Sequence, residues 1–268
     1  MTTIRSVARA SRILVHLGEQ PEGRTAKEVA DALSLPLPTA YHLLGTLVTE
    51  GLAAKDSRRR YRLGPALGPI ADAFVRQFSP PEYLIGPLHQ LADETGETAY
   101  IGAWRHDRIV VLASVEGGNA VRVSGAHLGY VESAHARASG KLLLAFASDE
   151  VRGAYLMLNP LVPVTPRTIV QPNEFELELE RIRLRGYAVD EEEFREGVAC
   201  IAAPVIESGN AVAAYSVSAP AERFGRRRAA LIECVLVATG RAAEAGGHDA
   251  RTRAASDRFH HLESRTAS

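Results

Sequence analysis

Apolar positions near the N-terminus recur at the spacing of an α-helix. They form one stripe of Val7, Ala10, Ile13, Leu14 and Leu17, and Gly18 then ends it as a typical C-terminal signal of a helix. Thr25, followed three residues later by Glu28, predicts a capping box at the start of a second helix, which ends near Leu33. A third stripe follows directly and consists of Ala40, Leu43, Leu44 and Leu47. Three short helices in close succession are therefore expected.

The third of these helices has an unusual start, with prolines at positions 36 and 38. Leu37 precedes a proline, so its backbone is pushed away from helical angles. Pro38 suits the first helical position, because its missing N–H costs nothing there. We therefore expect the helix to start near Pro38, with Leu37 just outside it. Without a polar cap, the N–H groups of Thr39 and Ala40 are expected to stay free for a phosphate.

Residues 51–64 read as two short strands around a turn at Asp56 and Ser57, which places arginines at the tip of a wing. Up to Leu63 the chain has ten basic and six acidic residues, a net charge of +4, whereas the whole chain carries −1. A basic bias on a winged helix-turn-helix is typical of DNA binding. The alternative is a module of the same shape that binds a protein partner.

A recognition helix enters the major groove by its N-terminal end, so the outward residues of the third helix are the candidates for DNA contact. The expected DNA-binding residues are Pro38, Thr39, Tyr41, His42, Thr46, Arg58, Arg59, Arg60 and Arg62. Of these, Thr39, Tyr41 and His42 are assigned to base readout and the wing arginines to phosphates.

After the wing the pattern changes twice. A linker helix is expected in residues 65–81, where Ser79, Pro80 and Pro81 stop it. Further helices are then predicted in 82–95, in the later, apolar part of 133–151, and in 175–185 and 226–245. Strands are predicted in 98–104, 108–115 and 120–125, and the remaining strands within 187–207 and 211–222. This order indicates an α/β sensor-like domain with a cupped sheet. The predicted division is a DNA-binding domain (1–64), a linker (65–81), a ligand-binding domain (82–246) and a mobile tail (247–268).

Composition narrows the class of protein. Hydrophobic residues make up 46% and charged residues 24% of 268, which indicates a folded chain. We find no apolar run that could span a bilayer, and residues 1–11 lack the apolar core expected of a signal peptide. Cys200 and Cys234 form neither a disulfide framework nor a metal-ligand motif, so a reduced, cytoplasmic protein without metal or cofactor is expected. Gly140-Lys141 is no phosphate loop, since Leu142 stands where serine or threonine is required.

Several motifs resemble the IclR family of bacterial transcription regulators. Residues 35–47 are similar to the family's L-P-K-S-T-x-H-R-L-L-x-T-L, and residues 60–64 to the end of its G-R-Y-R-L-G. Leu37, Pro38 and His42 depart from it and make this recognition helix less basic. The family's H-A-x-A-x-G-K, G-Y-A-x-D-x-E-E, G-V-x-C-[IV]-A-A-P-V and S-V-S-[AG]-P are matched at 135–141, 186–193, 197–205 and 216–220. The resemblance therefore covers Ile4 to about Gly246.

The resemblance implies an α+β or α/β chain with a winged helix-turn-helix, a linker helix and a C-terminal mixed α/β, GAF-like effector domain. In the family, the C-terminal motifs line a pocket for a small organic acid. Carried over by motif, the effector-binding residues are Ala138, Ser139, Asp190, Cys200, Ser216 and Ser218. A loop that opens a helix presents N–H groups to a carboxylate, and serines two apart on a strand share a face. Asp190 would repel a carboxylate and suits a hydroxyl, whereas Arg137 would neutralise an acid if it turned inward.

Each of these residues also has a purely structural interpretation. Cys200 in an apolar strand fits a buried small hydrophobe, residues 191–193 fit a solvated edge, and His135 fits a loop-ordering role. Tyr100, Trp104 and Tyr130 fit either an aromatic lining or the core.

The expected function is that of a ligand-responsive repressor that controls a catabolic operon for a small organic or aromatic acid. A homodimer or dimer of dimers would place two recognition helices about 34 Å apart on a double-stranded, near-palindromic operator. The alternative is a cysteine-dependent hydrolase in which Cys200, His135 and Asp190 act as nucleophile, base and orienting group. Such a triad is recognised only by its geometry.

Overall fold

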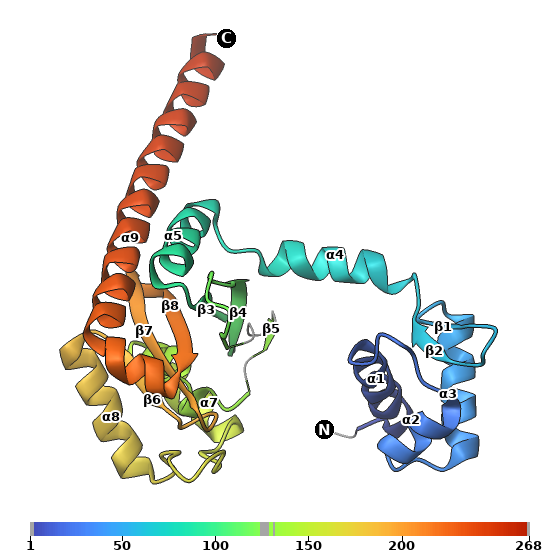
Figure 1. Ribbon diagram of the computed structural model, residues 1–268. Coiled ribbons are helices and arrows are strands. Elements are labelled where there is room, and N and C mark those ends of the chain that lie inside the picture. The colour runs from blue at the N-terminus through green and yellow to red at the C-terminus, as the bar shows by residue number, and fades with distance from the viewer. Residues whose placement is uncertain (1–2, 124–128, 131, 267–268) are drawn as a thin grey trace. The chain divides into compact units, whose positions relative to one another are not determined.

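The computed structural model describes residues 3–123, 129–130 and 132–266 (Figure 1). The chain divides into two compact units, Met1–Gln77 and Phe78–Ser268. The division falls at the end of helix α4 (Leu67–Phe78), which lies within the predicted linker. None of the helices in the described ranges is long and apolar enough to cross a membrane.

The first unit is a winged helix-turn-helix (Figure 1). Its elements are α1 (Arg5–Gly18), α2 (Ala26–Ala32), α3 (Leu37–Thr49), β1 (Ala53–Lys55) and β2 (Tyr61–Leu63). The two strands pair antiparallel, and one core joins the helices to them through Ile13, Val29, Leu44 and Tyr61. Tyr61 N–H also donates to the Arg24 carbonyl at 2.7 Å. The wing is thereby tied to the connection between α1 and α2.

The predicted capping box at α2 is confirmed. Glu28 N–H donates to Thr25 Oγ1 at 3.3 Å, and Thr25 N–H donates to Glu28 Oε2 at 2.7 Å. Two backbone donors that helix geometry leaves without a partner are satisfied reciprocally. The pair fixes where α2 begins, and α2 leads directly into the turn before α3.

Helix α3 begins at Leu37, which confirms the predicted start near Pro38, but the placement of Leu37 outside the helix is wrong. Pro36 is the N-cap, with φ −57° and ψ 134°, and the Ala40 N–H donates to its carbonyl at 3.1 Å. This bond draws Leu37 into the first turn, because the restriction before a proline is only a preference. Ala40 N–H is therefore not free, whereas the Thr39 N–H has no acceptor among the described residues.

The second unit is built on a six-stranded sheet with the order β5-β4-β3-β8-β7-β6. The strands are β3 (Thr98–Arg105), β4 (Arg108–Val115), β5 (Gly129–Tyr130), β6 (Ala188–Glu191), β7 (Val198–Glu207) and β8 (Asn210–Pro220). Every neighbouring pair is antiparallel. The sheet therefore has two faces on which residues alternate along each strand.

The strand predicted at 120–125 is wrong over 120–123, and 124–125 lie outside the described residues. Arg122 Nε donates to Glu116 Oε2 at 3.0 Å, and Arg122 Nη1 donates to the Asn119 carbonyl at 3.2 Å. Thr98 Oγ1 donates to the Val123 carbonyl at 2.6 Å. These side-chain bonds hold the segment as a turn, although its alternating valines fit a strand.

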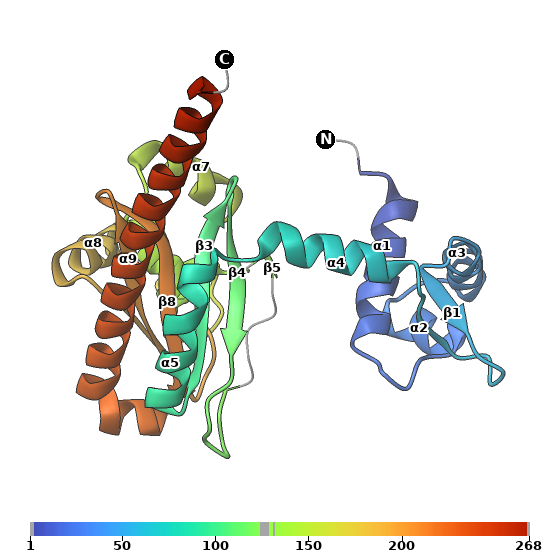
Figure 2. The same cartoon turned by 90° about the horizontal axis from the view of Figure 1, so that it is seen from above.

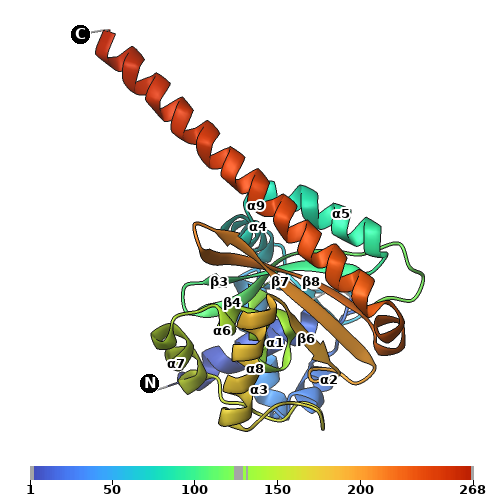
Figure 3. The same cartoon turned by 90° about the vertical axis from the view of Figure 1, so that its left-hand side faces the viewer.

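Helices cover both faces of the sheet (Figures 2 and 3). One face packs against η1 (Glu82–Leu84), α5 (Ile85–Thr95) and α9 (Ala221–Thr266). The other faces η2 (Ala134–Ala136), α6 (Ala138–Ala145), α7 (Asp149–Leu158) and α8 (Pro172–Arg185). Ile101 and Tyr215 belong to the first core, and Tyr100 and Cys200 to the second.

Two helices are longer than predicted. Helix α8 begins at Pro172 rather than 175, with the proline in its first turn, where it is tolerated. Helix α9 begins at Ala221 rather than 226 and continues to Thr266, so residues 247–266 are helical where a mobile tail was expected. The expectation relied on a missing apolar stripe. The three alanines and four arginines of this segment nevertheless have high helix propensity.

Gly140 allows α6 to approach the η2 turn. A Cβ at this position would lie 2.0 Å from the Ala134 carbonyl oxygen. Gly140→Ala is therefore expected to lower the free energy of unfolding by about 3 kcal/mol, because backbone rather than a side chain must move. Urea denaturation followed by the fluorescence of Trp104, the single tryptophan, measures this change.

The matched control is Gly153→Ala in α7, where an added Cβ meets nothing within 4 Å. It is expected to raise the free energy of unfolding by about 0.5–1 kcal/mol, through helix propensity alone. Equal stabilities of the two variants would contradict a close approach at Gly140.

Candidate functional site

The exposed face of α3 carries the residues predicted to contact DNA. Ala40, Leu44 and Leu47 are buried in the first unit. Tyr41 is 51% exposed, and His42 and Thr46 are also exposed, whereas Thr39 is half-buried. The Thr46 hydroxyl donates to the His42 carbonyl at 3.0 Å. Tyr41 and His42 therefore offer the freest side chains near the start of the helix.

The four wing arginines fall into two pairs. Asp56 Oδ1 accepts the N–H groups of Arg58 and Arg60, both at 2.9 Å, which shapes the tip of the hairpin. The side chains of Arg58 and Arg59 are exposed at this tip. Arg60 lies 3.7 Å from a Glu28 carboxylate oxygen, and Arg62 donates to the Glu22 carbonyl at 3.3 Å. Arg58 and Arg59 are thus the least engaged of the four.

In the second unit, strand pairing brings four of the predicted effector residues together. Cys200 pairs with Asp190 on β6 and with Ser218 on β8, and Ser216 pairs with Tyr100 on β3. Cys200 Sγ lies 2.8 Å from Ser218 Oγ. The Tyr100 hydroxyl contacts both Ser218 Oγ and, at 3.5 Å, Cys200 Sγ. A small polar cluster therefore lies on an otherwise apolar sheet face.

The start of α6 covers this face. Ala138 and Ser139 are buried in its first turn, and a Cβ added to Gly102 on β3 would lie 3.4 Å from Ser139 Cβ. Arg137 is the N-cap, and its carbonyl accepts the Lys141 N–H at 2.9 Å. The positive end of a helix is thereby directed to the sheet face that holds the polar cluster.

Asp190 is a carboxyl whose burial disfavours its charge, whereas its contacts favour the charge. Its Oδ1 accepts the N–H groups of Glu193 at 2.7 Å and Phe194 at 3.3 Å. Burial raises the pKa of Asp190 to about 6, against the lowering effect of Lys141 and of these two N–H groups. Both hydrogen bonds end on Oδ1, so the carboxyl retains capacity for a further hydroxyl group.

The triad of the alternative hydrolase does not assemble. His135 Nε2 lies 2.9 Å from the Val162 carbonyl oxygen and takes no part in the cluster around Cys200. Burial raises the pKa of the Cys200 thiol to about 12, so the thiolate needed by a nucleophile does not form at neutral pH. Burial also lowers the pKa of His135. The structure gives His135 the loop-ordering role and leaves Cys200 as a buried thiol.

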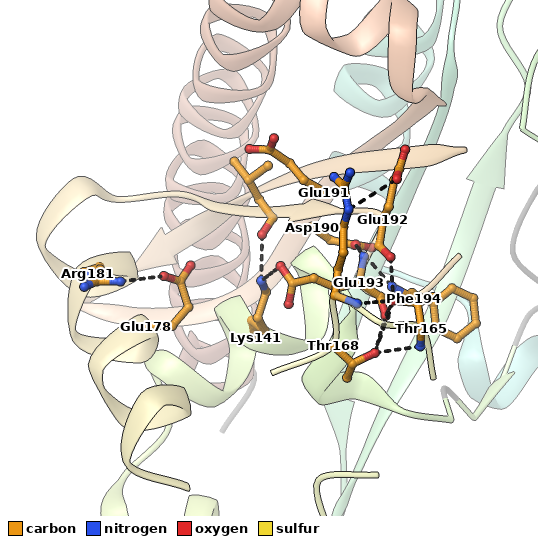
Figure 4. A network of polar contacts seen from close by, with 12 residues as sticks. Lys141, Thr165, Thr168, Glu178, Arg181, Asp190, Glu191, Glu192, Glu193 and Phe194 are labelled. Atoms are coloured by element: carbon orange, nitrogen blue, oxygen red, sulfur yellow. Dashed lines mark hydrogen bonds and ion pairs between the residues drawn. The ribbon is translucent and has the colours of Figure 1, made fainter. Parts of the chain in front are cut away.

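Sequence reasoning missed a buried ion pair beside this site (Figure 4). Lys141 is 1% exposed, and its Nζ donates to the Val189 carbonyl at 2.7 Å and pairs with the Glu193 carboxylate. Burial raises the pKa of Glu193 to about 7, against the opposing effect of Lys141. The predicted solvated edge is correct for exposed Glu191 and wrong for Glu193. The available signal was a lysine in an apolar helix, which requires an anion.

Two threonines hold the loop that carries Glu193. Thr168 Oγ1 donates to the Glu193 carbonyl at 2.6 Å, and Thr165 Oγ1 donates to the Glu192 carbonyl at 2.7 Å (Figure 4). The proline-bearing segment before α8 is thereby fastened to the loop between β6 and β7. The loop that these threonines hold donates two N–H groups to Asp190 and so positions it at the end of β6.

The aromatic residues considered for the site differ in their surroundings. Tyr100 belongs to the polar cluster, whereas Trp104 packs edge-on against Tyr155 with ring centroids 5.3 Å apart. Trp104 Nε1 also donates to the Leu143 carbonyl at 3.4 Å, which identifies it as a core residue. The side chain of Tyr130 lies outside what the structure describes.

Comparison with known families agrees with the structure of the first unit and of the second unit. Residues 6–57 match the IclR helix-turn-helix domain, and residues 83–244 match the domain described as bacterial transcriptional regulator IclR C-terminal. The chain belongs to the IclR family. It is therefore a ligand-responsive, DNA-binding transcription regulator and not an enzyme.

Individual members of the IclR family are similar along most of the chain. The regulator BhcR of Paracoccus denitrificans is 32% identical over 240 residues, which cover 89% of this chain and 85% of BhcR. The Thermotoga maritima IclR structure has a TM-score of 0.70 and 27% identity, over 90% of this chain and 98% of that one. An IclR homologue of Microbacterium hydrocarbonoxydans complexed with 4-hydroxybenzoate shares the fold, with a TM-score of 0.68 and 22% identity, over 90% and 98% of the two chains.

The raised pKa of Asp190 predicts a pH-dependent stability. The folded protein holds a proton that the unfolded chain releases above pH 3.8. The resulting contribution of Asp190 to the free energy of unfolding is therefore complete below about pH 4 and is lost as pH rises through about 6. Asp190→Asn is expected to reduce the fall in unfolding free energy between pH 4 and 8 by on the order of 2 kcal/mol. Urea denaturation between pH 4 and 8 measures it, with the exposed Asp93→Asn as control. If the unfolding free energy of Asp190→Asn depended on pH as that of the wild type does, the raised pKa of Asp190 would be contradicted.

The Lys141–Glu193 pair predicts a large and pH-dependent cost of removing one partner. Lys141→Met leaves Glu193 buried beside no cation, which is expected to cost about 3–5 kcal/mol of unfolding free energy. The cost is expected to be greater at pH 8 than at pH 5, because Glu193 is protonated at the lower pH. Adding Glu193→Gln should restore at least half of the loss.

The control for this cycle is Arg226→Met, which breaks an exposed pair with Glu222. Its expected cost is below about 1 kcal/mol at either pH. A Lys141→Met variant as stable as this control would show that the buried pair contributes nothing.

Proposed function

We propose that this regulator is a repressor that controls a catabolic operon for a small organic or aromatic acid. A homodimer or dimer of dimers would occupy a near-palindromic operator in double-stranded DNA. The observation that carries the proposal is the polar cluster of Asp190, Cys200, Ser218 and Tyr100 on the sheet face beneath α6. Polar groups of this kind on an apolar face suit a small ligand that has both polar and apolar parts.

The effector would be bound between α6 and the sheet. The first-turn N–H groups at Ala138 and Ser139 suit a carboxylate, and Asp190 and Ser216 suit a hydroxyl. Cys200 and Ser218 would complete the contact surface as neutral groups. The 4-hydroxybenzoate complex of the Microbacterium hydrocarbonoxydans homologue supports an acid with a second polar group.

DNA would be read by α3 and held by the wing. Thr39, Tyr41 and His42 are assigned to base edges, with Pro38 and Thr46 beside them on the same helix. Arg58, Arg59, Arg60 and Arg62 are assigned to phosphates, which give affinity without sequence information. Two copies of this short surface are needed, because one recognition helix reads only a few base pairs.

Repression is the simplest output of such an assembly. A dimer that covers its operator excludes other proteins from the same DNA, and this needs no contact beyond DNA binding. The effector can release the operator only by binding the two conformations of the dimer with different affinity. An effector that bound both equally would change nothing.

The DNA-binding half is tested by fluorescence anisotropy on DNA from upstream of the protein's own gene. We expect binding that resists excess random competitor at fixed salt. Arg58→Ala and Arg59→Ala are each expected to weaken binding to all sequences and to reduce the slope of log K against log salt by about 1. His42→Ala should instead reduce the ratio of specific to random binding.

Arg181→Ala in α8 is the matched control, because this arginine is 67% exposed in the other unit. It should leave affinity and salt slope unchanged. Equal losses for Arg181→Ala and Arg58→Ala would contradict a role of the wing. A promoter fused to a reporter then tests the sign, and higher expression in the presence of the regulator would reject repression.

A further inference from the structure

Arg137 places a cation at the edge of the candidate effector site. It is the N-cap of α6, and its Nε donates to the Glu132 carbonyl at 3.1 Å. The carbon of its guanidinium lies 3.3 Å from the centroid of the Phe194 ring. This stacking fixes the plane of the guanidinium group, as is common for arginine on an aromatic face.

The charge of Arg137 has no anionic partner in the described part of the chain. No carboxylate of a described side chain lies within 4.0 Å of its nitrogens. Its two terminal nitrogens likewise have no acceptor among the described residues, although the side chain is only half-exposed. A partly buried guanidinium commonly pairs with an anion, because desolvating it without one is unfavourable.

Arg137 lies next to the candidate effector site, because its guanidinium stacks on Phe194, whose N–H donates to Asp190 Oδ1 at 3.3 Å. Burial lowers the pKa of Arg137, and Tyr100, Cys200, Asp190 and Glu132 act in the opposite direction. The fully buried Ser216 Oγ, which pairs in register with Tyr100, also has no hydrogen-bond partner among the described atoms. One unpaired cation and one unpaired hydroxyl are therefore present at the same sheet face.

We propose that Arg137 is the anchor for a carboxylate of the effector, and that Phe194 is the positioning residue that holds the guanidinium in place. The inference rests on the proposed function and specifies its ligand as a small hydroxycarboxylate. A guanidinium binds a carboxylate through two parallel hydrogen bonds, which gives geometry as well as charge. The first-turn N–H groups of α6 begin at the residue after Arg137 and would support the same carboxylate.

The loop that carries Phe194 connects the two ends of such a ligand. Its ring contacts Arg137, and its N–H donates to Asp190 Oδ1 at 3.3 Å. The carboxylate end of the ligand would therefore meet Arg137, and the hydroxyl end Asp190 or Ser216. Repulsion between Asp190 and the acid is avoided, because the two negative groups lie at opposite ends.

Calorimetric titration of the full-length protein tests the anchor. The probes are 4-hydroxybenzoate, benzoate and lactate, each compared with its neutral carboxamide, and inorganic phosphate serves as a general anion. We expect at least one carboxylate to bind, its carboxamide to bind at least tenfold more weakly, and phosphate not to compete. Absence of binding by all three acids at 10 mM, or equal competition by phosphate, overturns the proposal.

Variants of the two residues assign their roles. Arg137→Gln is expected to weaken carboxylate binding about 10- to 100-fold and to abolish the preference over the carboxamide. Phe194→Leu should weaken it about threefold, and Phe194→Tyr should restore it, since the ring face is retained. A purely structural role of Phe194 would change the melting temperature without changing the ratio of acid to amide binding.

The same variants separate this inference from the function it rests on. Arg137→Gln should bind operator DNA as the wild type does without an acid, and should no longer respond to the acid. If this variant keeps full affinity for the carboxylate, the anchor is wrong while the regulator remains. If the wild type shows no competitor-resistant DNA binding but selects acids through Arg137, the proposed function fails and the anchor stands.

Discussion

The buried pair of Lys141 and Glu193 is the interaction on which the effector half of this protein depends. An ammonium group can remain inside an apolar core only with an anion and further acceptors beside it, and here Glu193 and the Val189 carbonyl supply both. The pair joins α6 to the loop after β6. Helix α6 carries Ala138 and Ser139, and the loop follows directly after Asp190 at the end of β6.

This constraint explains how Asp190 and Arg137 come to lie at one site. Glu193 and Phe194 donate their N–H groups to Asp190, and the Phe194 ring holds the Arg137 guanidinium. Anchoring Glu193 therefore positions an acid and a base at once. The remaining polar groups come from neighbouring strands, where antiparallel register alone aligns Cys200 with Ser218. The sheet thus positions Cys200 and Ser218, and the anchored loop positions Asp190 and Arg137.

Much of the fold was accessible from local pattern. Thr25 and Glu28 predicted the start of α2, because a capping box is made within one turn. The wing followed from two short strands around Asp56, and the outward face of α3 from helical spacing. The sequence predictions were wrong where side-chain contacts, a single capping bond or helix propensity alone set the local structure. The segment 120–123 is held as a turn by side-chain bonds, Leu37 is drawn into α3 by the bond from Ala40 to Pro36, and α9 continues without an apolar stripe.

The sequence by itself determined the winged helix-turn-helix, the strand-rich second unit and the motifs that identify the family, because these depend on spacing within short segments. Only the tertiary structure decided that Glu193 is buried rather than solvated and that Arg137 stacks on Phe194, whose N–H donates to Asp190. It also separated His135 from Cys200. Burial and the distance between residues 50 positions apart are properties of packing, and no local pattern encodes them.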